Sequence, residues 1–292
     1  MPDIVTSIGY LADLDLYKRE KPYCVLVSPE QAANLPPDTQ TSNLEFEQHE
    51  NILVKDIRDC EPSAFGLDKT GFEVVTDLFD VSDIQGWSGL RQYQTQTEKF
   101  LRAQFGVDRV VCWEVTLRHN VQREAMVVDL NDWTIPDGPA AGAHNDVTAI
   151  SGPNIIADHL PEELKAVYHN GGYRFRIVNT WRPLLASLED NPLALCDFRS
   201  VDPDDLVPAD RVIPSNEGEV YYLKYNPDQK WYWLDSMTMD ELFIFIMYDS
   251  EKGPQARYCP HVPVKNPRAP AEAPPRKSVE TRSILISKVA DT

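Results

Sequence analysis

Basic residues are scarce in this 292-residue chain, which has 28 Lys and Arg against 46 Asp and Glu and a formal net charge of −18. Proteins that bind nucleic acids or anionic membranes concentrate Lys and Arg on one surface. The shortage therefore argues against both kinds of partner. An anionic small molecule would have to be bound by a few local arginines against this acidic background.

Cysteine is also scarce, since the chain has five and the number is odd. The cysteines are widely spaced and form no C-x-x-C pair; they are Cys24, Cys60, Cys112, Cys196 and Cys259. This pattern argues against a disulfide framework and against a zinc ribbon. We expect reduced thiols in a cytosolic protein.

Long hydrophobic runs are lacking. The longest, Leu242–Tyr248, is far too short to span a bilayer. Met1–Val5 lacks the basic and then apolar pattern of a secretory signal. We therefore expect a cytoplasmic protein that is not attached to a membrane. The hydrophobic fraction of 42% supplies enough apolar surface for a sizeable core, and we predict a single domain over residues 1–292.

Short runs of β-branched and aromatic residues, separated by turn residues, dominate the chain. We predict strands at Tyr23–Val27, Ile52–Lys55, Phe72–Val75, Arg109–Leu117, Ala125–Asp129, Tyr173–Asn179, Leu193–Asp197, Glu219–Tyr225, Lys230–Leu234, Glu241–Tyr248 and Val279–Ile286. Many short strands at this spacing are typical of a barrel or a double-sheet jelly roll. The predicted fold class is mainly β with flanking helices.

Two segments have helical spacing. Leu90–Phe105 places apolar residues on one face and is followed by Gly106, a suitable C-cap. Pro161–Tyr168 predicts a second helix, with Asp158 or His159 near its start. Pro136–Gly142 is rich in turn residues and leads into the sequence His144-Asn145-Asp146.

His144 and Asp146 are two residues apart, so on a strand both side chains point to the same side. An imidazole and a carboxylate in this arrangement can bind one metal ion together. A distant second histidine would complete a 2-His-1-carboxylate site with open positions, as non-haem Fe(II) oxygenases require. The pair alone is a weak signal, because Asp146 could instead cap a turn.

His261 is the candidate for the second histidine, because it lies 115 residues after Asp146. That gap is long enough to hold the intervening strands of a double-stranded β-helix. The other histidines lack a suitable strand context, and we expect His159 and His169 at the surface; the remaining two are His49 and His119.

Arg276, Ser278 and Arg282 have even spacing, so on one strand all three face the same side. A guanidinium is planar and permanently charged, and it binds a carboxylate through two hydrogen bonds. One arginine could bind the distal carboxylate of 2-oxoglutarate with help from Ser278, and the other the substrate or a structural acid. The alternative is an exposed edge strand protected by basic residues.

The order of these elements is more specific than any one of them. An H-x-D pair, a distant histidine and an Arg-x-Ser on the next strand together predict an oxygenase that uses Fe(II), 2-oxoglutarate and O2.

The chain also resembles a known family, the fungal AsaB-type hydroxylase/desaturases, also called gibberellin desaturase-like or CmcJ-like. The matching segments are Val178–Leu184, Pro192–Val201, Asp205–Pro208, Tyr225–Trp233, Met237–Ser250, Pro260-His261 and Pro275–Arg282. The resemblance implies a double-stranded β-helix of the jelly-roll or cupin-like type that oxidises a small secondary metabolite. It covers the C-terminal half well, so residues 106–292 should form the β-helix core with the metal site. Residues 1–105 match poorly and are expected to be substrate-specific.

The resemblance implies the same site residues, with iron at His144, Asp146 and His261 and the Arg-x-Ser at Arg276 and Ser278. Arg282 matches a trailing arginine of the family. Two departures flank the ligands: Ala143 precedes His144 where valine is commoner, and Val262-Pro263 follows His261 where Thr-Ala is common.

Arg182 belongs to one of the matching segments, in the turn Trp181-Arg182-Pro183. It could reach the mouth of the pocket and touch 2-oxoglutarate or substrate. Alternatively, it is a structural arginine paired with an acid such as Asp197.

Two other functions stay open at this point. A protein of this fold could bind a small molecule or accompany another enzyme without turnover, or it could be a cupin-like enzyme that does not need 2-oxoglutarate. The sequence identifies neither the substrate nor the outcome, which could be hydroxylation, desaturation or ring formation. It is silent on oligomeric state, and a homodimer is possible.

Overall fold

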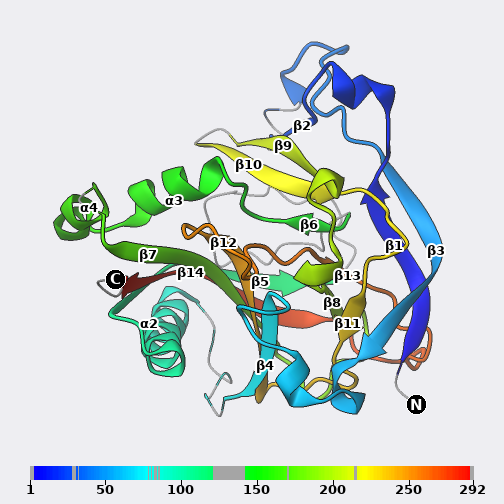
Figure 1. Cartoon of the computed structure of the whole chain (residues 1–292). Helices are drawn as coiled ribbons and strands as arrows, with labels where there is room; N and C mark the ends of the chain where they lie inside the picture. Colours follow the sequence, from blue (N-terminus) through cyan, green and yellow to red (C-terminus); the bar gives the residue numbers. More distant parts are fainter. Residues whose placement is uncertain are drawn as a thin grey trace.

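In the part of the chain that the computed structural model describes, two β-sheets are accompanied by the helices α2, α3 and α4 (Figure 1). The structure describes residues 3–27, 31, 33–77, 79, 81, 84, 86–120, 142–169, 171–213 and 216–289. The predicted strand Ala125–Asp129 and all of the turn Pro136–Gly142 except its last residue lie outside the described residues. Among the described residues, no helix is long and apolar enough to cross a membrane.

The larger sheet has nine strands in the order β1-β3-β11-β8-β13-β6-β10-β9-β2. Their bounds are β1 Ile4–Leu11, β2 Tyr23–Val25, β3 Phe46–Asp56, β6 His144–Asn145, β8 Leu193–Cys196, β9 Leu206–Ile213, β10 Asn216–Leu223, β11 Trp231–Trp233 and β13 His261–Pro263. Strands from the beginning of the chain form both edges of this sheet, and two very short strands, β6 and β13, lie next to each other near its middle.

The smaller sheet has five strands in the order β4-β12-β7-β14-β5. Their bounds are β4 Phe72–Thr76, β5 Arg109–His119, β7 Tyr173–Pro183, β12 Glu241–Asp249 and β14 Lys277–Lys288. All neighbours in this sheet are antiparallel. The long strand β14 pairs with β7 on one side and with β5 on the other, so residues from three distant parts of the sequence meet along it.

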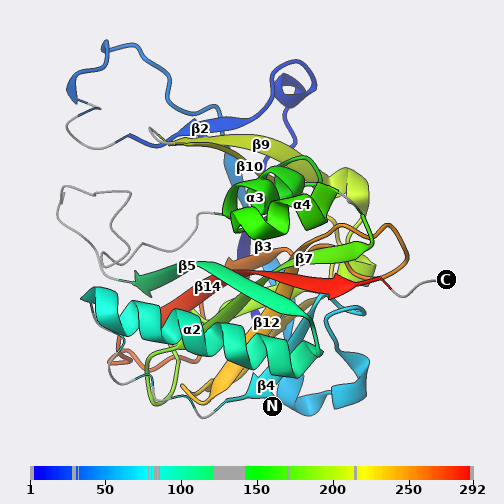
Figure 2. The same ribbon diagram turned by 90° about the vertical axis from the view of Figure 1, so that its left-hand side faces the viewer.

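Helix α2 (Gly86–Phe105) covers the outer face of the smaller sheet (Figure 2). It buries Leu90, Tyr93, Thr97 and Leu101, the face expected from their spacing, and Gly106 ends it with a φ of 58°. Helices α3 (Ser151–His159) and α4 (Glu162–His169) follow β6. Short 3-10 turns lie at Asp15–Lys18, Ile57–Asp59, Pro62–Ala64, Phe198–Ser200 and Pro203–Asp205.

The main core lies between the two sheets. It joins residues of the larger sheet, such as Leu195, to residues of the smaller one, such as Phe245 and Ile284. Ile284 has the same parity on β14 as Arg282, so the side of β14 that carries Arg282 faces this core.

Most predicted elements are present. Strands β1 and β9 and helix α3 were not expected, and no bounds were predicted for the short strands β6 and β13. The second predicted helix corresponds to α4; Asp158 and His159, expected near its start, are the last two residues of α3. The side chain of His159 is exposed, as expected, and its ring stacks on Trp113 with centroids 5.1 Å apart. The side chain of His169 lies outside the described part of the structure.

Candidate metal centre

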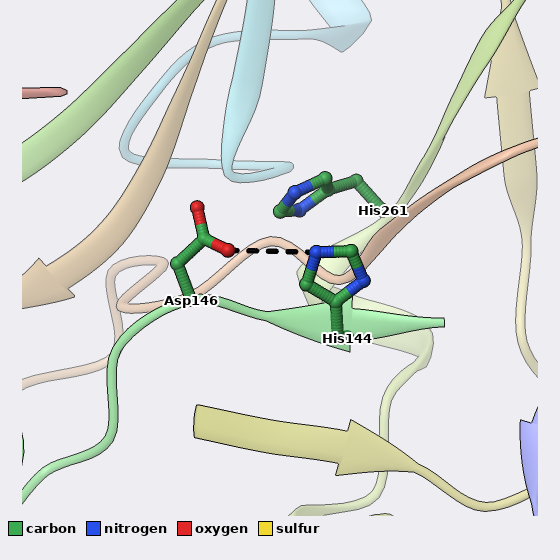
Figure 3. Close-up of side chains that lie close together, drawn as sticks. All are labelled: His144, Asp146 and His261. Atoms are coloured by element: carbon green, nitrogen blue, oxygen red, sulfur yellow. Dashed lines mark ion pairs between the residues drawn. The ribbon is translucent and has the colours of Figure 1, made fainter. Parts of the chain in front are cut away.

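His144, Asp146 and His261 point toward one another (Figure 3). One ligand atom from each lies within 4.8 Å of the other two. His144 is on β6 and His261 on β13, and the two residues are cross-strand partners in the larger sheet. Asp146 immediately follows β6, and its Oδ1 lies 3.4 Å from Nε2 of His144. The structure thus brings together all three residues that the sequence singled out as metal ligands.

Both imidazoles are oriented by backbone carbonyls. Nδ1 of His144 lies 2.8 Å from the carbonyl oxygen of Gly142, and Nδ1 of His261 lies 3.1 Å from that of Cys259. A carbonyl oxygen can only accept, so Nδ1 carries the proton in each neutral ring. Each Nε2 then keeps a lone pair, which is the arrangement that metal-binding histidines adopt.

The charge state of the cluster also suits a cation. Burial lowers the pKa of His261 to about 3, with a further contribution from His144, so the ring is neutral at pH 7. Burial by itself would raise the pKa of Asp146. The guanidinium of Arg282 and the two imidazoles outweigh that effect, and the pKa of this carboxyl lies well below its usual range. The site therefore presents a carboxylate and the neutral imidazole of His261 beside the imidazole of His144.

Asn145, between His144 and Asp146, stabilises the backbone around the cluster through its side-chain amide. Its side chain is fully buried and points away from His144 and Asp146, because alternate residues of a strand face opposite sides. The amide nitrogen donates to the carbonyl oxygens of Val147 (2.6 Å) and Met247 (3.0 Å), and the amide oxygen accepts from the backbone N–H of Cys259 (3.0 Å). The last bond ties β6 to the segment that carries His261.

The second oxygen of Asp146 is surrounded by donors. Oδ2 accepts from Nδ2 of Asn179 at 2.7 Å and from Nε and Nη2 of Arg282 at 3.2 and 3.1 Å. Arg282 also binds Oε2 of Glu114 at 2.8 Å, and its Nη2 lies 3.7 Å from Oε1 of Glu280. The sequence suggested that one arginine could pair with a structural acid, and these contacts place Arg282 among three acids.

Arg276 has a different environment. Its side chain is almost fully buried, and Nη1 donates to the carbonyl oxygen of Asn191 at 3.0 Å, while Nε has no partner. Among the described residues, no carboxylate lies within ion-pair distance of it. Burial, with the nearby Arg118, lowers the pKa of Arg276 to about 10. Ser278 is also fully buried, and its hydroxyl has no partner.

This chain is similar in sequence to known proteins over most of its length. Residues 9–286 match the family described as an oxidoreductase/YMDC permease-like domain. Hydroxylase/desaturase efuI of Hormonema carpetanum is 32% identical, covering 80% of this chain and 82% of that protein. The Fe(II)/2-oxoglutarate-dependent dioxygenase nvfI of Aspergillus novofumigatus is 28% identical, covering 86% and 87%.

The chain belongs to this family of fungal hydroxylase/desaturases and Fe(II)/2-oxoglutarate-dependent dioxygenases. The family resemblance, the enzyme class and the oxygenase function predicted from the sequence are confirmed. The solved structure of a variant of the iron and alpha-ketoglutarate-dependent endoperoxidase NvfI superposes with a TM-score of 0.83 at 24% identity and covers 99% of both chains. This match confirms the jelly-roll fold class.

Arg182 faces the opposite side of the smaller sheet from Asn179 and Arg282, which bind Asp146. It alternates on β7 with Trp181, whose ring is in the inter-sheet core, so its own side chain faces α2. The guanidinium pairs with the carboxylate of Asp77, donates to the carbonyl oxygen of Met239 at 3.2 Å, and lies 5.8 Å from the centre of the Tyr93 ring. These are the contacts of a structural arginine, although the acid is Asp77 and not Asp197.

Proposed function

We propose that this protein oxidises a small secondary metabolite at an iron site formed by His144, Asp146 and His261. The observation that supports these ligands is the convergence of two lone-pair Nε2 atoms and one carboxylate within 4.8 Å. Two neutral nitrogens and a carboxylate on one side of an ion are the donor set that Fe(II) takes in oxygenases with open positions.

We further propose that Arg276 binds the distal carboxylate of 2-oxoglutarate and that Ser278 adds a hydrogen bond. A buried cation without an anionic partner is costly, and so is a buried hydroxyl without a hydrogen bond. One carboxylate placed between them would remove both costs. This argument favours Arg276 over Arg282, whose guanidinium already binds two carboxylates.

When bound, iron supplies the oxidation of a substrate C–H bond, with O2 consumed and 2-oxoglutarate converted to succinate and CO2. The residues of the chain bind the substrate and orient it toward the iron. Phe245 packs beside the His261 ring with centroids 4.8 Å apart, and Tyr222 lies 6.4 Å from the His144 ring. These aromatic rings give the surroundings of the site an apolar character suited to a metabolite skeleton.

The N-terminal part of the chain contacts the aromatic residues around the site. This contact supports a role in substrate choice for residues 1–105. Phe46 on β3 packs edge-on against Tyr222, with ring centroids 5.2 Å apart. A Cβ on Gly142, two residues before His144, would lie 2.5 Å from the Phe46 ring, so only glycine allows this approach. Because residues 1–105 also supply strands to both sheets, we propose that residues 1–292 form one domain.

Anaerobic titration of the purified protein with Fe(II) and 2-oxoglutarate tests the proposal. We expect a weak visible charge-transfer band that saturates at one iron per chain and is missing in His144→Ala. A companion protein without turnover would give no band and no succinate. An enzyme of the cupin-like type would bind Fe(II) and turn over substrate without 2-oxoglutarate. Either result would contradict the proposal.

A further inference from the structure

Two residues that face each other across β7 and β14 bind the same oxygen of Asp146. Asn179 and Arg282 are cross-strand partners, and both donate to Oδ2, as described above. Asn179 is fully buried, and its Nδ2 also donates to Oε1 of Glu280 at 3.1 Å. The positions of Asn179 and Arg282 are therefore fixed by the register of the smaller sheet, whereas Asp146 immediately follows β6 of the larger sheet.

We infer that Asn179 and Arg282 form a carboxylate clamp, which holds Oδ2 so that Asp146 offers only Oδ1 to the metal ion. Both are positioning residues in this sense. The inference rests on the proposed iron site and adds a role for two residues that need not touch iron, 2-oxoglutarate or substrate.

The physical reason is the number of coordination positions. A carboxylate can bind a metal ion through one oxygen or through both. If Asp146 used both, it would fill a position that 2-oxoglutarate or O2 needs. Three N–H groups on Oδ2, two of them charged, compete with the ion for that oxygen's lone pairs. Oδ1 is on the side of His144, 3.4 Å from its Nε2, and stays available.

The surrounding acids keep the arginine of the clamp in place. Glu114 binds the opposite corner of the guanidinium at 2.8 Å, and Glu280 lies 3.7 Å from it. A register shift between β5 and β14 at Arg282 and Ser283 lets the consecutive residues Trp113 and Glu114 both face the interior. The irregularity in β5 thus brings Glu114 to the arginine.

The test compares four variants of the full chain. Asn179→Leu removes the side-chain amide at similar size and without a change of charge. The side-chain oxygen Oδ1 that is lost with it has no hydrogen-bond partner. Arg282→Met removes the guanidinium. Arg282→Lys keeps the charge but loses the planar group that donates two hydrogen bonds to one carboxylate. The matched control is Thr180→Val, which breaks the 2.6 Å bond between the buried hydroxyls of Thr180 and Thr281, the next cross-strand pair, on the opposite face.

Three quantities are measured: the Mn(II) dissociation constant by electron paramagnetic resonance, the 2-oxoglutarate dissociation constant at saturating metal, and the crystal structure of each Mn(II) complex. We expect one bound oxygen of Asp146 in the parent and two in Asn179→Leu and Arg282→Met. The 2-oxoglutarate constant should rise about 10- to 100-fold in both variants, the usual range for residues that orient a metal ligand. Arg282→Lys should be intermediate, and Thr180→Val should match the parent.

Asn179→Leu separates the clamp from direct binding of 2-oxoglutarate, because a neutral amide cannot supply an ion pair to the co-substrate. If only the Arg282 variants weaken 2-oxoglutarate binding and Asp146 keeps one bound oxygen throughout, Arg282 is a direct ligand of the co-substrate and the inference is wrong. The same conclusion follows if both clamp variants behave like Thr180→Val. A parent protein that binds no Mn(II) would instead overturn the proposed iron site. If Arg282→Met does not fold, Asn179→Leu and Arg282→Lys still decide the question.

Discussion

His144 and His261 lie directly opposite each other on β6 and β13, with ring centroids 4.4 Å apart. These strands are only two and three residues long. Their pairing is supported by longer neighbours, since β6 also pairs with β10 and β13 with β8. The two histidines that we propose as metal ligands are therefore held by main-chain hydrogen bonds of the larger sheet, while the smaller sheet supplies Asn179 and Arg282, which bind Asp146.

This arrangement predicts that the proposed metal ligands can be removed without unfolding the chain. His144→Ala should unfold at nearly the parent temperature without metal, because its side chain is not part of the apolar core clusters, whereas Asp146→Asn also removes the carboxylate that pairs with Arg282 and should unfold at a lower temperature. Both should lose stoichiometric Fe(II) binding and turnover. Metal analysis, thermal unfolding and succinate production check these outcomes. His159→Ala is the control, since this exposed histidine stacks on Trp113 outside the triad; parent-like iron binding in His144→Ala would rule out the assignment.

The three clustered residues that we propose as metal ligands could be singled out from the sequence because their signal is local. In an H-x-D pair the two side chains point to the same side of a strand, and His261 is the last histidine before the Arg-x-Ser segment. The strands themselves are visible as short β-branched and aromatic runs. Helix α3 was missed because Gly152 and Pro153 lie near its start and suggest a turn. Proline is tolerated in the first turn of a helix, where its missing N–H has no partner to lose.

The contacts around Asp146 could not be predicted in the same way. They depend on the register between β7 and β14 and on the irregularity of β5, which turns two consecutive side chains to one face. Parity alone would place Trp113 and Glu114 on opposite faces. Glu280 did have a detectable signal, because it lies between Ser278 and Arg282 with the same parity. Asn179 lies in a segment that carried the family resemblance but has no strand partner that the sequence reveals.

Arg276 and Ser278 should affect 2-oxoglutarate and not the metal. Arg276→Lys is expected to raise the 2-oxoglutarate dissociation constant about 10- to 100-fold, since a hydrogen bond to a charged group contributes about 1.5–3 kcal/mol. Ser278→Ala should raise it about 10-fold, at the lower end of that range, because it removes a single hydrogen bond to the carboxylate, worth about 1.5 kcal/mol. Ser278→Ala should also leave the ligand-free protein at least as stable as the parent, because the buried hydroxyl has no partner to lose. Calorimetric titration with and without saturating Mn(II) measures these effects; unchanged binding in Arg276→Lys would exclude it as the partner.

The five thiols should differ sharply in reactivity. Cys24 and Cys60 are partly exposed, whereas Cys112, Cys196 and Cys259 are buried. Burial raises the pKa of the Cys112 thiol to about 12, and the thiolate is the reactive form. In the native protein at pH 8 we expect a colorimetric thiol reagent to modify two groups, and all five after denaturation. Replacement of Cys24 and Cys60 by serine should abolish the native reaction; rapid modification of a third thiol would contradict the burial of these residues.

The buried pair of Arg182 and Asp77 should be a determinant of stability and not of binding. Arg182→Met leaves the Asp77 carboxylate without its charged partner, and breaking one side of a buried pair costs about 3–5 kcal/mol. Denaturant unfolding should show that loss, while the folded variant keeps the parent's dissociation constants for Mn(II) and 2-oxoglutarate. The double variant Arg182→Met with Asp77→Leu should recover part of the stability, because no unpaired charge remains. A rise in the 2-oxoglutarate dissociation constant of Arg182→Met, with unchanged stability, would instead support the role of Arg182 at the mouth of the pocket.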